Sequence, residues 1–189
     1  MEDRIRSLNS TYLLPTIVII SLLVMLCTPS AHAQTPGDGS DVELTESDII
    51  IFCSGHEGGS IKAARGHGKK RFGSLENFYN NYHRIQCPPH FPSPLYMSIS
   101  DHPFSIQVDK EIEFISRLSP EKRHLILNRP SKGFFKQTVL GVVERKLKIN
   151  REAGNDEAIA RYKDLREMLR DAGAKRLAEL TEEEKAAFN

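Results

Sequence analysis

The fold class of this 189-residue chain is decided by the stretch Thr138–Gly173, TVLGVVERKLKINREAGNDEAIARYKDLREMLRDAG. It contains the two clearest helical patterns, Thr138–Ile149 and Asp156–Ala172, one on each side of Gly154. In the second pattern, apolar side chains recur every three or four residues, which places them on one helix face. These residues are Ile159, Tyr162, Leu165, Met168 and Leu169. Gly173 then suits a left-handed C-cap, so the stretch predicts an elongated helical hairpin.

Shorter helical patterns precede this hairpin. Ser74–Ile85 places its apolar residues at helical spacing, and Val108–Leu118 does the same. Leu95–Ser100 follows a proline, which is welcome at the first position of a helix. Ser119 is a good N-cap, and Pro120 after it suits the first helical turn. Because strand patterns are weak, the sequence predicts a mainly α-helical protein.

Two stretches of the chain align as a repeat. The first opens with Ser93-Pro94-Leu95-Tyr96-Met97-Ser98 and continues to a second helix at Glu111–Leu118. The second opens at Thr138–Val143 and closes with Leu165–Ala174, which ends in Ala-Gly-Ala. This arrangement resembles the ankyrin repeat, whose first helix opens T-P-L-H-x-A and whose apolar second helix ends in Gly-Ala. The two openings lie 45 residues apart, whereas the period of that family is about 33 residues.

The resemblance implies a short ankyrin-like solenoid of helix pairs over residues 44–178, with an irregular N-terminal unit and an elongated last hairpin. Such repeats stack because one unit cannot bury its apolar face alone. It also implies a protein-binding module rather than an enzyme. We expect residues 34–43 to form a flexible leader, and residues 179–189 to form a charged C-terminal tail.

The N-terminal segment, residues 1–33, has the pattern of a cleavable signal peptide. Its apolar run Leu13–Leu26 is too short to span a bilayer comfortably, and Ala31-His32-Ala33 forms an A-x-A cleavage site. We therefore expect a periplasmic or secreted protein that begins at Gln34, with no stable membrane insertion after cleavage. Lipidation at Cys27 and an uncleaved anchor are the alternatives.

Two cysteines, Cys53 and Cys87, remain after residue 33. In an oxidising compartment two cysteines tend to form a disulfide, which is our prediction. With His56 and His83 they also supply two sulfurs and two nitrogens, a conceivable zinc set. A cysteine nucleophile with His56, His67 or His83 as its base is a further alternative.

A basic stretch, HGKKR at His67–Arg71, is predicted to be a surface loop that contacts an acidic partner. The candidate partner-binding residues are His67, Lys69, Lys70 and Arg71. The whole chain carries a formal net charge of only +1, which argues against a general nucleic-acid or membrane-surface binder. The glycine-rich segment Gly55–Gly59 lacks the G-K-[ST] ending of a P-loop, and no cofactor is predicted.

The sequence therefore predicts an exported module that binds another protein. One concrete form is a periplasmic inhibitor or immunity protein that neutralises a toxic effector. It would use its basic loop or elongated hairpin to plug an active site. The alternative is a small secreted enzyme or metal-binding protein that uses the cysteines and histidines of residues 53–87.

Overall fold

The computed structural model describes residues 37–54, 61–87, 94–131 and 136–188, and in these ranges all regular structure is helical. The elements in chain order are α2 (Glu46–Ser54), α3 (Ile61–Phe72), α4 (Leu75–Asn80), the 3-10 turn η1 (Tyr82–Arg84), α5 (Pro94–Asp101), α6 (Ile106–Ser116), α7 (Pro120–Leu127), α8 (Val139–Glu152), α9 (Asp156–Asp171), the 3-10 turn η2 (Leu177–Glu179) and α10 (Glu182–Ala186). The prediction of a mainly α-helical protein is confirmed.

Short polar side chains fix where the helices begin. The side chains of six N-cap residues each accept a hydrogen bond from a backbone N–H in the first turn: Ser74, Ser105, Ser119, Thr138, Asn155 and Thr181. Such caps satisfy backbone donors that have no partner within the helix. Pro120 occupies the first turn of α7, as its sequence position predicts. Gly173, after α9, has φ +94°, the left-handed conformation expected of a glycine C-cap.

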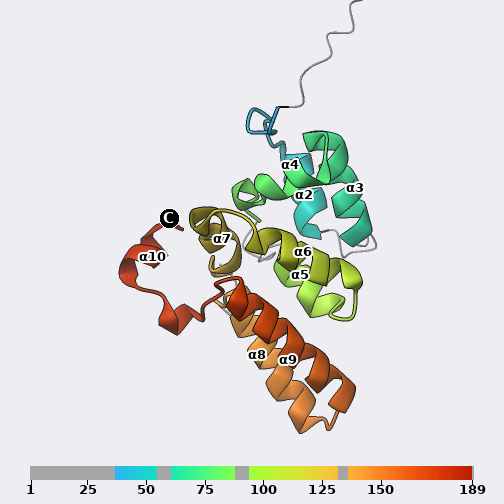
Figure 1. The fold of residues 1–189 in the computed structure, drawn as a ribbon, viewed down its shortest axis with the longest axis vertical. Helices are drawn as coiled ribbons and strands as arrows, with labels where there is room; N and C mark the ends of the chain where they lie inside the picture. Colours follow the sequence, from blue (N-terminus) through green and yellow to red (C-terminus); the bar gives the residue numbers. More distant parts are fainter. Residues whose placement is uncertain (1–36, 55–60, 88–93, 132–135, 189) are drawn as a thin grey trace, which may run out of the picture. The chain divides into compact units, whose positions relative to one another are not determined.

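The helices pack as short pairs (Figure 1). The longest pair, α8 and α9, forms the elongated hairpin predicted from residues 138–173. The first helix of this pair, α8, packs against α5, and the second, α9, packs against α6. Helix α5 also contacts α2. The described helices therefore stack pair on pair, consistent with the predicted helix-hairpin solenoid.

One continuous apolar core joins the pairs. Its most completely buried side chains include Leu95 and Ile99 of α5, Val108, Ile112 and Ile115 of α6, Leu140, Val142 and Val143 of α8, and Leu165 and Leu169 of α9. On the predicted apolar face of α9, Ile159 and Met168 are only partly buried. Burying one such aliphatic side chain contributes about 1.5–3 kcal/mol, so these contacts hold the stacked pairs together.

The basic stretch His67–Arg71 is helical, which corrects the prediction of a loop. The stretch forms the second half of α3, and this helix continues through Gly66 and Gly68. A Cβ atom at Gly68 would come within 2.5 Å of the Phe78 ring, so the glycine allows α3 and α4 to approach closely. Packing between the two helices therefore overrides the low helix propensity of glycine.

The described part of the predicted leader, residues 37–43, is held against the helices. Asn77 and Asn81 donate side-chain hydrogen bonds to the carbonyl oxygens of Gly37 and Asp38. Arg84 does the same to Gly39 and Val42. These contacts join the described part of the leader to α4 and η1. The predicted signal peptide and residues 34–36 lie outside the described residues.

The C-terminal tail contains a short helix, α10 (Glu182–Ala186). Thr181 and Glu184 form a reciprocal capping box at its start. After α10, the ring of Phe188 stacks on His124 of α7, with the ring centroids 4.9 Å apart. No helix among the described residues is long and apolar enough to cross a bilayer.

Candidate interaction site

Basic side chains lie on two sides of helix α3. The helix buries Ala64, Gly68 and Phe72. Because side chains three, four or seven positions apart share a helix face, Lys62 and Lys69 fall on one side of this buried stripe. His67 and Arg71, four positions apart, fall on the other side.

His67 and Arg71 are engaged within the protein. The Nε2 atom of His67 lies 2.7 Å from Oδ1 of Asp48 in α2, and Nε of Arg71 lies 3.0 Å from the same oxygen. Burial raises the pKa of Asp48, but hydrogen bonds from Thr45 and His67 and the charge of Arg71 hold it well below its usual range. These two basic residues therefore tie α3 to α2.

The opposite side of α3 borders a groove. We define the α3 groove by its lining residues, Lys62, Arg65, Gly66, Lys69, Leu75 and Gln107, which enclose ≈ 340 Å³. Among the residues that the structure describes, Lys62 and Lys69 have no carboxylate within ion-pair distance. None of the described residues that line the groove is acidic. The groove thus offers unpaired positive charge beside an apolar side chain.

Arg65 lines the α3 groove, and its guanidinium lies over a buried aromatic ring. Its guanidinium carbon lies 5.9 Å from the centroid of the Tyr79 ring, a cation–π arrangement. The same residue also lines an internal cavity of ≈ 20 Å³, together with Tyr82, Ser98 and Glu111. Arg65 therefore lies between the groove and the interior, whereas Lys62 and Lys69 are exposed to solvent.

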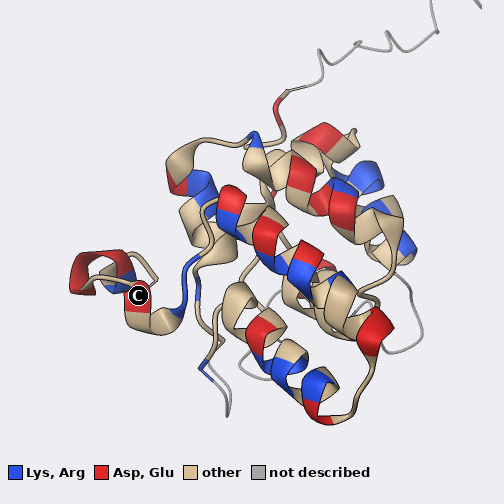
Figure 2. Ribbon diagram, turned by 60° about the horizontal axis from the view of Figure 1, so that its bottom comes forward, with Lys and Arg blue, Asp and Glu red and all other residues tan. Residues whose placement is uncertain are grey.

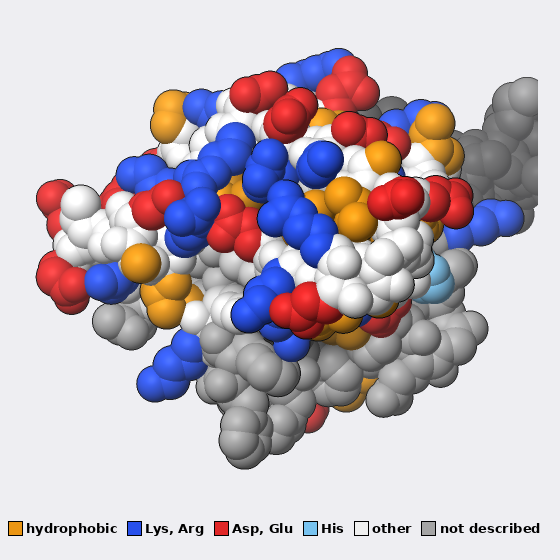
Figure 3. All heavy atoms as spheres, turned by 90° about the horizontal axis from the view of Figure 1, so that it is seen from below, with side chains coloured by type: hydrophobic (Ala, Val, Ile, Leu, Met, Phe, Trp, Pro, Cys, Tyr) orange, Lys and Arg blue, Asp and Glu red, His pale blue; other side chains and the backbone are white. Residues whose placement is uncertain are grey.

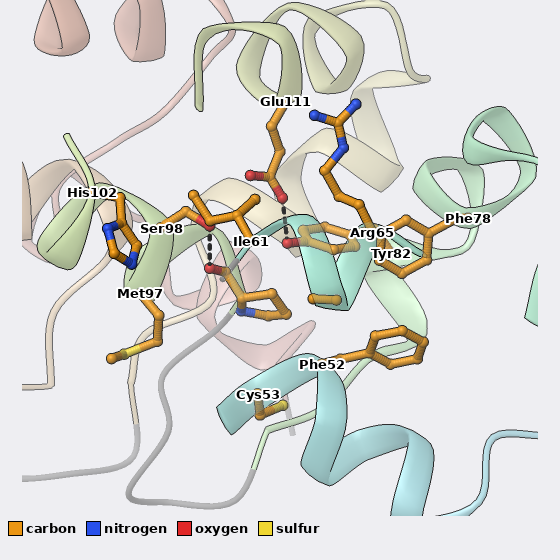
Figure 4. A pocket seen from close by; sticks show the side chains of 12 residues that line it. Phe52, Cys53, Ile61, Arg65, Phe78, Tyr82, Met97, Ser98, His102 and Glu111 are labelled. Carbon is orange, nitrogen blue, oxygen red and sulfur yellow. Dashed lines mark hydrogen bonds between the residues drawn. The ribbon is translucent and has the colours of Figure 1, made fainter. Parts of the chain in front are cut away.

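The internal cavity contains a buried carboxylate (Figure 4). Glu111 of α6 is 2% exposed and accepts a hydrogen bond of 2.5 Å from the hydroxyl of Tyr82. Burial raises the pKa of Glu111 to about 7, against the opposing effects of Tyr82 and Arg65. Burial and the nearby carboxylate raise the pKa of Tyr82 well above its usual value. The second oxygen, Oε2, has no hydrogen-bond partner among the described residues, and the cavity has room for about one water molecule.

The cysteine pair is placed as the sequence predicts. The sulfur atoms of Cys53 and Cys87 lie at bonding distance, with 5.6 Å between the Cα atoms, which fits a disulfide. While the two sulfurs are bonded to each other, neither can be a zinc ligand or a nucleophile. His56 lies outside the described residues, and within them no group of three metal-ligating side chains occurs. His83 is half-buried, and its Nδ1 atom has no hydrogen-bond partner in the part of the chain that the structure describes.

Elsewhere the described surface mixes charges of both signs. Figure 2 shows Lys and Arg interspersed with Asp and Glu along the helices. Figure 3 views the end at which α8 and α9 turn, and there basic side chains have acidic ones beside them. The ion pairs of α8, α9 and the segment after them include Lys148 with Glu152, Arg161 with Asp109, and Arg176 with Glu144. Lys62 and Lys69 of the α3 groove form no such pair with a described residue.

The structure divides the four residues predicted to bind a partner. Lys69 lines the α3 groove and Lys70 is exposed, whereas His67 and Arg71 contact Asp48. The sequence analysis missed Lys62 and Arg65. These two residues share a helix face with Lys69. The sequence predicts that shared face only when residues 61–72 are treated as one continuous helix.

Comparisons with models of protein families, with curated proteins and with solved structures give no match to this chain. The likeness to ankyrin repeats therefore stays a prediction.

Proposed function

We propose that this chain is an exported protein-binding module, in which a stack of ankyrin-like helix pairs presents the α3 groove to a partner protein. One observation carries the proposal. The groove contains two exposed lysines without a carboxylate partner among the described residues, whereas basic residues such as Lys148, Arg161 and Arg176 form ion pairs. Unpaired charge of one sign in a concave surface is typical of a site that meets the opposite charge.

Two features support export. The sequence of residues 1–33 has the pattern of a cleavable signal peptide. The sulfurs of Cys53 and Cys87 are placed for a disulfide, a bond that persists in oxidising compartments. A protein made for the periplasm or for secretion explains both features.

The specific form that we propose is an inhibitor or immunity protein that neutralises a toxic effector. Helical repeat proteins bind through extended, rigid surfaces, and a rigid surface can cover an active site with little loss of conformational entropy. A catalytic cleft lined by carboxylates would complement the α3 groove. The elongated α8–α9 hairpin provides a second rigid element for such contact.

Two measurements test this function. The first is the intact mass of the protein purified from the compartment to which it is exported, with and without thiol alkylation under denaturing conditions. We expect a chain that begins at Gln34 and takes up no alkylating reagent. Two alkylatable thiols, or retention of residues 1–33, would contradict the export argument and favour the alternative of a cysteine-based enzyme or metal site.

The second measurement is crosslinking in the native compartment, followed by purification of the crosslinked protein. The purified partner should bind the module stoichiometrically, and an enzymatic partner should lose activity as the module is added. If no protein crosslinks to the folded module in its own compartment, the binding function is wrong.

A further inference from the structure

The two exposed lysines of the α3 groove are spaced along one helix face. Lys62 and Lys69 are seven residues apart in α3, which corresponds to about 10 Å along the helix axis. Between them Gly66 has no side chain, and a Cβ atom placed there would meet nothing within 4 Å. Gly66 therefore places no side chain between the two lysines on this part of the helix surface.

We propose that the α3 groove binds an acidic polypeptide segment of the partner, with two carboxylates of that segment on Lys62 and Lys69. This inference rests on the proposed function and names the chemistry of the partner. In a polyproline II conformation, which has three residues per turn and a rise of about 3.1 Å, residues three positions apart lie on one face about 9 Å apart. The spacing of the lysines thus matches acidic residues at every third position of a segment in this conformation.

The remaining lining residues suit a polypeptide. Leu75 gives the groove an apolar strip, on which the aliphatic part of a glutamate side chain can pack. Gln107 carries both a donor and an acceptor for the backbone of a bound segment. Arg65 is fixed over Tyr79, so it adds positive potential without having to be ordered on binding.

The observations favour a polypeptide over a nucleic acid. Nucleic-acid binders neutralise many phosphates with a continuous basic surface. Here the net charge of the chain is +1, and on the face seen in Figure 3 basic side chains alternate with acidic ones. The α3 groove is thus a small basic region on an otherwise mixed surface.

The test uses a charge reversal, Lys62→Glu together with Lys69→Glu, in the exported full-length chain. The matched control is Lys148→Glu with Lys163→Glu, which makes the same change in net charge on exposed residues of α8 and α9. Circular dichroism should show both variants folded, because all four lysines are exposed. The probe is a fluorescent peptide with glutamate at every third position and glycine between.

Fluorescence anisotropy at low ionic strength, where surface charges are least screened, gives the binding constants. The wild type and the control should bind the glutamate peptide, and none of the proteins should bind the matching glutamine peptide. The Lys62→Glu/Lys69→Glu variant should bind about tenfold more weakly, the effect of losing two exposed ion pairs. It should instead bind a peptide in which lysine replaces glutamate.

Three results would overturn the inference. The first is binding of the glutamate peptide by the charge-reversed variant with wild-type affinity. The second is equal binding of the glutamate and glutamine peptides by the wild type. The third is binding of a single-stranded oligonucleotide to the wild type as tightly as the peptide, with loss of that binding in the same variant, which would make the groove a general polyanion site.

The crosslinked partner separates this inference from the function on which it rests. If the charge-reversed variant still captures that partner with wild-type affinity, the module binds protein elsewhere and only the α3 groove assignment fails. If the wild type captures no partner, the proposed function itself fails.

Discussion

The hydroxyl of Tyr82 donates a 2.5 Å hydrogen bond to Oε1 of Glu111, and both side chains are buried. The bond joins η1 to α6, and so it links the N-terminal helices to the stacked pairs. Arg65 lines the same cavity from α3 (Figure 4). A carboxyl group with a pKa raised to about 7 at this position makes the stability of the fold depend on pH near neutrality.

Glu111→Gln should weaken that pH dependence. In wild type the folded state keeps the proton of Glu111 up to about pH 7, whereas the unfolded chain releases it near pH 4.5. The folded state therefore binds more protons in this window, and the free energy of unfolding falls as the pH rises through it. The fall attributable to Glu111 is about 3 kcal/mol at most. Urea unfolding followed by circular dichroism between pH 5 and pH 8, roughly the range set by this linkage, measures it.

The control is Glu113→Gln, on an exposed residue of the same helix, which removes a carboxyl group without touching the buried site. His83 acts in the opposite sense, because burial and Lys122 lower its pKa. Its contribution is common to wild type and both variants and cancels in the comparison. Parallel pH profiles for wild type and Glu111→Gln would contradict the prediction.

Asp48→Asn should destabilise the N-terminal helices. The substitution removes the negative partner of His67 and Arg71, and Asp48 is 3% exposed. We expect the free energy of unfolding to fall by about 2 kcal/mol at neutral pH, the cost of breaking charge-assisted hydrogen bonds to a buried group. Because the folded-state pKa is lowered, this stabilisation is present above about pH 4 and is lost as the pH falls further.

Chemical denaturation of Asp48→Asn and wild type at neutral and at acid pH measures this difference. Asp164→Asn, on an exposed residue of α9, serves as the matched control and should change stability by no more than about 0.5 kcal/mol. A destabilisation that stays constant into strongly acid pH would show that the ion pairs are not its cause.

Gly68→Ala and Gly66→Ala should act in opposite directions although they lie on the same helix. Alanine favours a helix by about 1 kcal/mol over glycine, and Gly66→Ala meets no neighbouring atom within 4 Å. At Gly68 the new Cβ atom would lie 2.5 Å from the ring of Phe78, which is 1% exposed and has little room to move. We expect Gly66→Ala to raise the thermal midpoint and Gly68→Ala to lower it, as overpacking costs about 1–3 kcal/mol.

Replacing both cysteines with serine should remove the stabilisation that the disulfide gives. The bond between Cys53 and Cys87 spans a sequence separation of 34 residues, and closing a loop of this length stabilises a fold by about 3–4 kcal/mol in the chain-entropy model. Wild type should lose a similar amount when dithiothreitol is added during urea unfolding, while Cys53→Ser/Cys87→Ser should be indifferent to the reductant. Equal sensitivity of the two proteins would argue against the bond.

The sequence predicts the C-terminal half of the fold better than the N-terminal half. Residues 138–173 have long runs of apolar residues at helical spacing, with Gly154 and Gly173 at the points where the helices end. These signals are local, and local patterns are what sequence periodicity reports. In α3 the helix depends on contact between Gly68 and Phe78, which a local pattern does not contain.

The sequence predicts only part of the candidate site, because local patterns do not contain contacts between distant residues. Lys69 and Lys70 could be chosen from the basic run alone, but the exclusion of His67 and Arg71 depends on Asp48, 19 and 23 residues away. The burial of Glu111 could be predicted from the sequence, because the residue shares a helix face with Val108, Ile112 and Ile115. All of these residues are buried. A charged residue on an apolar face is a signal that periodicity can detect, although its partner Tyr82 cannot be found that way.

The disulfide between Cys53 and Cys87 encloses α3 and α4 in a covalent ring. A protease that cuts one peptide bond anywhere in this ring leaves a single molecule, because both fragments stay linked through sulfur. The lysines of α3 would thus remain attached to the core of α5, α6, α8 and α9 after such a nick. In a compartment rich in proteases, a module of this kind would lose its binding face only after a second cut or after reduction of the bond.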